Sequence, residues 1–242
     1  MSKDEVVIYW APDFAREQSF DWNYLYNDPT NVHSELKQEV SNPGIFLCPA
    51  VKDMLKHIFF FSSTVGADYC YNKEDSKFHS RVDNYLGIDE IRDKSFNNRH
   101  NITLSLSWIF FCEEPMTVEI TPPYFSSAEH LRYGSVIPGT FDIGGWFRPY
   151  NAEFILNKDV DELVINPNEP LFYAKFHTDK KIVFKRFYMD DNLKRIERSC
   201  SNSASVFGKF MSMADRYILF KKTSTDKKTI SYIKKNILTQ DK

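Results

Sequence analysis

The residues best suited to catalysis follow a predicted strand, where His177-Thr178-Asp179 forms an H-x-D pair. Non-haem iron oxygenases combine such a pair with one further ligand, because two imidazoles and a carboxylate leave iron positions open for oxidant and substrate. No histidine follows Asp179, so the third ligand would have to lie upstream, at His130 or Glu119. Aspartate is also common in tight hairpins, and a solvent-facing carboxylate is the better explanation of Glu119. We favour the structural interpretation.

A second group of chemically capable residues surrounds Gly144-Gly145 and consists of Asp142, Trp146 and Arg148. In a binding interpretation, Arg148 holds a carboxylate or phosphate while Trp146 forms an apolar wall. In a structural interpretation, the glycines allow close approach at a bulged strand and Arg148 pairs with Asp142 or Glu153. We favour the structural interpretation and keep Asp142, Trp146 and Arg148 as a candidate binding pocket.

Basic residues gather near the end of the chain. Residues 204–242 contain nine lysines and arginines against three aspartates, whereas the whole chain has a net charge of −2. We predict that Lys227, Lys228, Lys234 and Lys235 contact an acidic partner. The overall charge argues against a general nucleic-acid binder, so nucleic acid is expected to bind only through this basic segment, if at all.

No other recognisable catalytic motif occurs. The P-loop, nucleophile-elbow, zinc-protease and dinucleotide-binding patterns are all missing from the sequence. Cys48 and His57 could form a nucleophile pair, but they have no recognisable orienting partner. The four cysteines are scattered without a C-x-x-C pair, which favours reduced core residues over disulfides or zinc ligands. We therefore expect no cofactor, and iron or another divalent metal enters only with the oxygenase alternative.

The fold that positions these residues is predicted to be mainly β. Aromatic residues make up 16% of the 242 residues and glycines number only 8, which favours strands with bulky side chains over a glycine-rich nucleotide-binding fold. Residues 102–108 and 116–121 alternate apolar and polar side chains, as half-buried strands do. Short strands at intervals of about 8–12 residues indicate a β-sandwich or jelly roll of cupin-like type. We predict that Trp108, Phe154 and Phe184 are largely buried.

Helical patterns flank the predicted strands. Residues 31–40 predict an N-terminal helix, and an apolar stripe predicts an amphipathic C-terminal helix. The stripe consists of Phe207, Phe210, Met211, Ala214, Tyr217 and Ile218. Residues 62–100 show no sustained period and are predicted to be an irregular insertion. We expect one β-rich domain over residues 1–220 and a solvated, basic helical tail over residues 221–242.

Two turns in the sequence carry a resemblance to a known family. Residues 136–149 contain Trp146-Phe147-Arg148-Pro149, and residues 168–172 read Asn168-Glu169-Pro170-Leu171-Phe172. Together with Trp108 and the segments 21–23 and 47–50, they resemble a family of uncharacterised proteins carried by phages of marine cyanobacteria. The resemblance covers most of residues 1–190 and implies a viral origin and a cupin-like or jelly-roll sheet. It implies no catalytic residues.

These observations lead to an expected location and function. No apolar leader follows Met1, and apolar runs such as residues 58–61 are far shorter than the ~20 residues of a membrane span. We expect a soluble protein of the host cytoplasm or the virion, with no membrane contact. The leading hypothesis is a viral accessory or structural protein that binds a protein partner or itself without catalysis. The alternative is a small-molecule enzyme of cupin or non-haem iron oxygenase type that uses His177 and Asp179.

Overall fold

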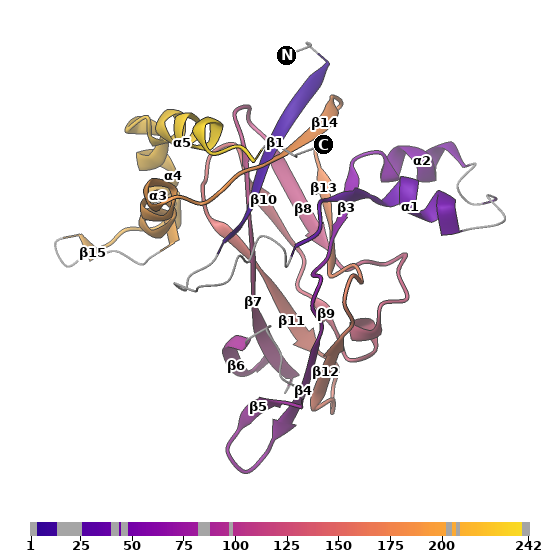
Figure 1. Ribbon diagram of the computed structural model, residues 1–242. Coiled ribbons are helices and arrows are strands. Elements are labelled where there is room, and N and C mark those ends of the chain that lie inside the picture. The colour runs from indigo at the N-terminus through magenta and orange to yellow at the C-terminus, as the bar shows by residue number, and fades with distance from the viewer. Residues whose placement is uncertain are drawn as a thin grey trace.

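The computed structural model describes residues 4–13, 26–39, 44, 48–81, 88–96, 99–201, 205–206 and 209–238. Strands dominate these residues, so the prediction of a mainly β protein is confirmed. Two larger sheets pack face to face, helices lie outside them, and a smaller sheet extends from one end (Figure 1). No helix among the described residues is both long and apolar enough to cross a membrane.

The first sheet has the strand order β14-β1-β7-β11-β9, and β6 also pairs with β7. Neighbouring strands are antiparallel except β1 and β14, which run parallel. The bounds are β1 Glu5–Asp13, β6 Ile88–Phe96, β7 Arg99–Cys112, β9 Gly134–Val136, β11 Pro149–Leu156 and β14 Lys181–Arg186. The long strand β7 therefore forms the centre of this sheet.

The second sheet is antiparallel throughout and has the order β10-β8-β13-β3-β2. Its bounds are β2 Thr30–Asn31, β3 Ile58–Phe61, β8 Thr117–Thr121, β10 Gly139–Asp142 and β13 Phe172–Phe176. Strand β10 is an outermost strand, and in the described part of the chain it pairs with β8 alone. One edge of β10 is therefore left without a neighbouring strand there.

The main core lies between the inner faces of the two sheets. Because side chains alternate along a strand, Trp108 and Phe110 of β7 point to the same face and meet Phe61 and Phe172 of the second sheet. Trp108 and Phe154 are fully buried, as predicted. Phe184 is only half-buried, which differs from the prediction, because it lies on the outermost strand β14.

Helices cover the outer face of each sheet. The outward side chains Tyr9 and Phe111 of the first sheet lie in one cluster with buried residues of α3 Asp191–Ser201, α4 Met213–Lys222 and α5 Thr225–Lys235. The outward side chains Ile58 and Tyr173 of the second sheet pack with α1 Val32–Glu39 and α2 Pro49–Leu55. Figure 1 shows these two groups of helices on opposite sides of the molecule.

The prediction of an irregular insertion at residues 62–100 is wrong for much of this segment. It contains β4 Ala67–Asn72, β5 Lys77–Ser80 and β6, and β4 pairs with β5 and with β12 Glu162–Ile165. Strands β4, β5 and β12 form the small sheet at the bottom of Figure 1, whereas β6 pairs with β7 of the first sheet. Strand β5 is largely exposed and β4 is short, with only Ala67 and Tyr69 buried, so neither gives a long apolar alternation in the sequence. Residues 82–87 and 97–98 lie outside the described part.

The C-terminal helices also differ from the prediction. The helix expected across residues 207–220 starts only at Met213, after a short hairpin of β15 Ser205–Val206 and β16 Lys209–Phe210, and Phe207 lies outside the described residues. In α4, Ala214 and Ile218 are exposed while Phe220 is buried, so the apolar stripe does not face the sheet as expected. The segment beyond residue 220 is not wholly solvated either, because Ile233 of α5 is fully buried in the cluster that includes Phe220.

Candidate functional site

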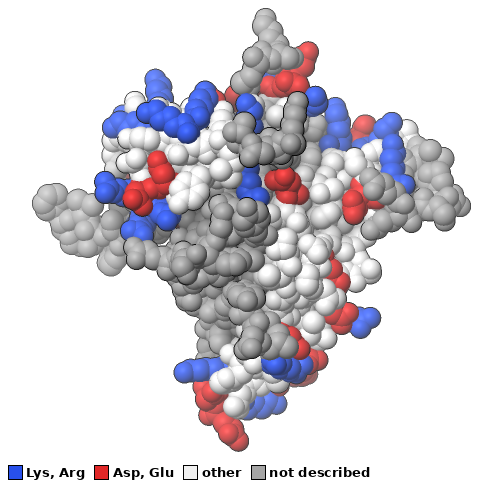
Figure 2. Space-filling view, in the orientation of Figure 1, with Lys and Arg blue, Asp and Glu red and all other residues white. Residues whose placement is uncertain are grey.

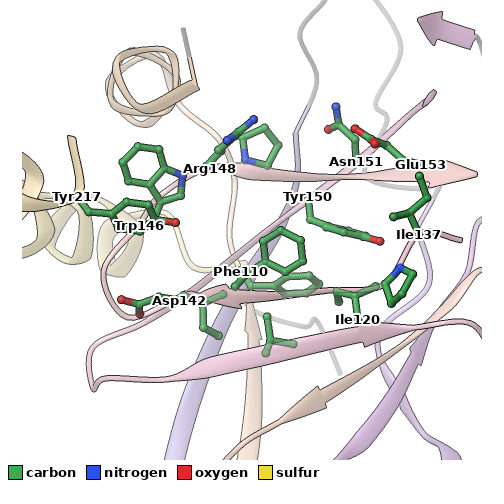
Figure 3. Close-up of a pocket in the computed structure, with 15 residues that line it drawn as sticks. Phe110, Ile120, Ile137, Asp142, Trp146, Arg148, Tyr150, Asn151, Glu153 and Tyr217 are labelled. Carbon is green, nitrogen blue, oxygen red and sulfur yellow. The ribbon is translucent and has the colours of Figure 1, made fainter. Parts of the chain in front are cut away.

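The candidate pocket predicted from Asp142, Trp146 and Arg148 exists, and all three residues line it (Figure 3). It has a volume of about 270 Å³ and lies between the two sheets, with residues of β10 and β11 in its lining. The inward side chains Phe110 and Ile120 line it from the two opposite sheets. The pocket therefore reaches from the surface into the shared core.

The glycine pair allows the segment that carries Asp142 and Trp146 to lie against the end of β7. The backbone N–H of Gly144 donates to Asp142 Oδ1 at 2.9 Å. A Cβ on Gly144 would collide with the carbonyl oxygen of Glu114, and one on Gly145 would lie 2.5 Å from Asp142 Oδ2. The close approach expected in the structural interpretation is therefore present, together with the pocket of the binding interpretation.

Trp146 forms one wall of the pocket. Its indole stacks on Tyr217 of α4 with the ring centroids 3.9 Å apart and an angle of 23° between the planes. The indole Nε1–H is buried and has no hydrogen-bond acceptor among the described residues. Tyr217, expected from its spacing to lie in the packing stripe of a helix, is thus a pocket residue.

Tyr150 is the second pocket residue that sequence reasoning missed. Its ring lies edge-on to Phe141 and Phe172, at centroid distances of 5.1 and 5.2 Å. Its hydroxyl is buried, and nothing in the described part of the chain hydrogen-bonds to it. Burial, and secondarily the Glu153 carboxylate, raise the pKa of this hydroxyl. Tyr150 therefore stays protonated and offers an O–H donor inside the pocket.

Charged side chains are also present around the pocket. Asp142, Arg148 and Glu153 line it. Burial raises the pKa of the Glu197 carboxyl on α3, and the nearby Arg148 guanidinium acts in the opposite direction. Arg148 and Asp142 also have opposite effects on the pKa of Tyr217, which burial raises. The pocket thus combines an aromatic interior with charges of both signs.

The residues proposed for an iron site do not converge on one point. His177 lies 3.4 Å from Glu119, between Nε2 and Oε2, on the partly exposed face of the second sheet. Asp179 lies near His57 instead: burial lowers the pKa of His57, and the Asp179 carboxylate has a smaller effect in the opposite direction. Within the described ranges, no three His, Cys, Asp or Glu side chains are grouped so that they could hold a metal ion.

His130 lies in a different environment from the other candidate ligands. It belongs to the short helix η3 Glu129–Arg132, is fully buried, and lies edge-on to Phe154 at 5.5 Å between centroids. Burial lowers the pKa of His130 to about 4. Neither ring nitrogen has a hydrogen-bond partner in the described part of the chain. His130 is therefore a neutral core residue at physiological pH.

The cysteines are free, as far as the structure describes them, but only two are core residues. Cys112 and Cys200 are buried, and burial raises the pKa of each thiol to about 11, so both remain unreactive thiols. Cys48 is exposed and Cys70 is partly exposed, which corrects the expectation that all four lie in the core.

The four candidate lysines of α5 differ in their surroundings. Lys234 Nζ lies 2.8 Å from Glu113 Oε1, which also accepts a hydrogen bond from Tyr9. Lys235 lies over the Tyr232 ring, 5.9 Å from its centroid. Lys227 and Lys228 are exposed, and Figure 2 shows basic side chains gathered over the C-terminal helices. Lys234 and Lys235 therefore have interaction partners within the protein, whereas the exposed Lys227 and Lys228 are the better candidates for contact with an acidic partner.

Comparisons of the chain with protein-family models, with curated proteins and with solved structures find no match.

Proposed function

We propose that the protein is a non-catalytic binding protein and that the pocket between β10 and β11 receives one side chain of a protein partner. One observation carries this proposal: two buried hydrogen-bond donors that lack acceptors in the described part of the chain line a partly aromatic pocket, and β10, which also lines it, has one edge without a neighbouring strand there. A pocket with convergent polar groups is the default candidate for a binding site.

A protein partner suits the surroundings of the pocket. Strand β10 is largely exposed, and Phe141, at 38% exposure, lies on it beside the pocket. An extended peptide can add to such an edge through main-chain hydrogen bonds and place one side chain in an adjacent pocket. The volume of about 270 Å³ is just below the ~300–1,000 Å³ of typical small-molecule sites, and is consistent with one side chain.

The wider assignment is also part of the proposal. The resemblance to phage-carried proteins supports an accessory or structural role in the host cytoplasm or the virion, with another protein or a second copy of the chain as partner. Two facing sheets around a common core support the jelly-roll, cupin-like class.

Blocked amino acids (N-acetyl amino-acid amides) test the binding function, because each presents one side chain without the rest of a peptide. The four tryptophans give four indole N–H signals in a ¹H–¹⁵N spectrum, and Trp146→Phe identifies the signal of the pocket. We expect a saturable shift of that signal with aromatic blocked amino acids. Absence of any shift up to about 10 mM, which corresponds to a binding free energy weaker than about −3 kcal/mol, would contradict the function.

A pocket-filling variant locates the binding. Ile137 is half-buried and lines the pocket, so Ile137→Trp should abolish the shift. The matched control is Ile182→Trp on β14, which replaces another half-buried isoleucine on the far strand of the first sheet. Iron or another divalent metal near one per chain in the purified protein, lost in His177→Ala, would instead favour the oxygenase alternative.

A further inference from the structure

The walls of the pocket favour a planar ring. Phe110, Phe141, Trp146, Tyr150 and Tyr217 all line it, so aromatic faces and edges form a large part of its walls, with aliphatic side chains between them. Figure 3 shows Tyr150 across the middle of the pocket, with Trp146 and Tyr217 together at one end. Aromatic rings pack against one another in offset-stacked or edge-to-face geometries. An aromatic ring is therefore the group that best complements these walls.

The polar groups of the interior offer hydrogen-bond donors. The Tyr150 hydroxyl and the Trp146 Nε1–H are buried and lack acceptors in the described part of the chain. The side-chain oxygen Oδ1 of Asn151 already accepts a hydrogen bond from Ser107 Oγ at 2.7 Å. The side-chain NH₂ group of Asn151, which also lines the pocket, can donate. A buried donor without an acceptor is unfavourable. A ligand that brings an acceptor to the pocket would relieve this penalty.

The charges disfavour an ionised ligand group. Asp142 and Glu153 line the pocket together with Arg148, so the two carboxylates outnumber the one cation in the lining. Asp142 and Arg148 are exposed and Glu153 is half-buried, so these charges lie toward the surface. An anion would meet the two carboxylates on entry, and a cation held deeper would meet the Tyr150 and Trp146 donors instead of acceptors. The group that fits is therefore uncharged.

We propose that the side chain bound in this pocket is a tyrosine. Among aromatic side chains, phenylalanine has no polar atom, tryptophan only donates, and the uncharged tyrosine hydroxyl can accept a hydrogen bond. The pocket then recognises an extended segment of the partner by its tyrosine ring and by an acceptor placed within reach of Tyr150. This inference rests on the proposed function, because it names the side chain for that same pocket.

The experiment compares the blocked forms of tyrosine, phenylalanine, tryptophan, glutamate and lysine, with the Trp146 indole signal as the readout. The tyrosine and phenylalanine probes differ only by the hydroxyl. We expect the tyrosine probe to bind about fivefold more tightly, which is the effect of one ordinary hydrogen bond. The charged probes should bind more weakly than both.

Tyr150→Phe assigns the preference to one atom. This variant keeps the ring that packs on Phe141 and Phe172 and removes a hydroxyl that has no partner in the described structure, so it should fold normally. It should bind the tyrosine and phenylalanine probes equally. Tyr71→Phe is the matched control, because Tyr71 lies on β4, outside the pocket, and it should keep the fivefold difference.

Two kinds of failure are distinguishable. If no probe shifts the indole signal, the proposed function fails together with this inference. If the phenylalanine probe binds as tightly as the tyrosine probe, or a charged probe binds best, the pocket still binds a side chain but tyrosine is the wrong one. A dimer of the chain that both Tyr150→Phe and Tyr188→Phe weaken about fivefold would support the inference and identify a second copy as partner, through the exposed Tyr188. A dimer whose affinity is unchanged by Tyr150→Phe contacts through another surface and contradicts a tyrosine supplied to this pocket by a second copy.

Discussion

Replacing Ile233 by alanine tests whether α5 is an integral part of the fold. Ile233 is fully buried, in a cluster with Phe111 of β7 and Phe220 of α4. The change removes three carbon atoms from the core, and about 0.8 kcal/mol for each gives about 2.4 kcal/mol. The cavity left behind adds to this value, so we expect a loss of about 3–4 kcal/mol in the free energy of unfolding.

The chain provides a matched control on the neighbouring helix. Ile218 of α4 is 51% exposed, so Ile218→Ala removes the same atoms from a site that is only half removed from water. We expect a loss of about 1 kcal/mol or less there. Both changes replace isoleucine by alanine within a helix, so the small gain in helix propensity is common to the two variants and cancels in the comparison.

Urea unfolding followed by circular dichroism measures both variants. We expect the two free energies of unfolding to differ by about 2 kcal/mol or more, with similar dependence on urea concentration. If Ile233→Ala loses no more stability than Ile218→Ala, then α5 does not pack on the first sheet. The solvated tail indicated by the sequence would then be correct.

Three other predictions concern the core and the C-terminus. Burial lowers the pKa of His130 from 6.5 to about 4, so the unfolded chain binds a proton at a higher pH than the folded chain does. The free energy of unfolding therefore falls by about 3 kcal/mol as the pH drops from above 6.5 to about 4. Unfolding curves of His130→Leu across this range should lack that loss, whereas His79→Ala at an exposed histidine should retain it; a His130→Leu curve with the wild-type pH dependence would contradict the assignment. Trp108→Ala should lower stability by about 3–5 kcal/mol, and a loss under about 1 kcal/mol in urea unfolding would place Trp108 outside the core. Deleting residues 223–242 should lower the melting temperature, because it removes the buried Ile233; an unchanged melting curve would show that α5 contributes nothing to the fold.

Much of the strand content follows from local sequence patterns. The alternation in residues 102–108 and 116–121 predicts strands within β7 and β8, and it gives Trp108 an inward position that the structure confirms. Period-two alternation is a local property, and it survives folding because one face of each strand meets the core. The sequence also allowed one group of pocket residues to be recognised, because Asp142, Trp146 and Arg148 lie within a few residues of one another.

The remaining features depend on contacts between distant segments. Strand β4 pairs with β12, which lies far along the chain, and the neighbouring strand β5 is largely exposed and carries no apolar period that would reveal it. Whether Ile218 or Ile233 is buried depends on which face of each helix meets the first sheet, and a helical apolar pattern does not identify that face.

The pocket depended most on tertiary structure. The sequence by itself determined that a tryptophan, an arginine and an aspartate lie close together beside two glycines. Only the fold brought Tyr217 of α4 onto Trp146, and only the packing of the sheets buried the Tyr150 hydroxyl away from any acceptor in the described structure. A hydrogen-bond donor becomes unpaired through what surrounds it, and those surroundings come from β7, β8, β10 and α4 together. For that physical reason, the sequence revealed the residue types near the pocket but not the two donors on which its proposed specificity depends.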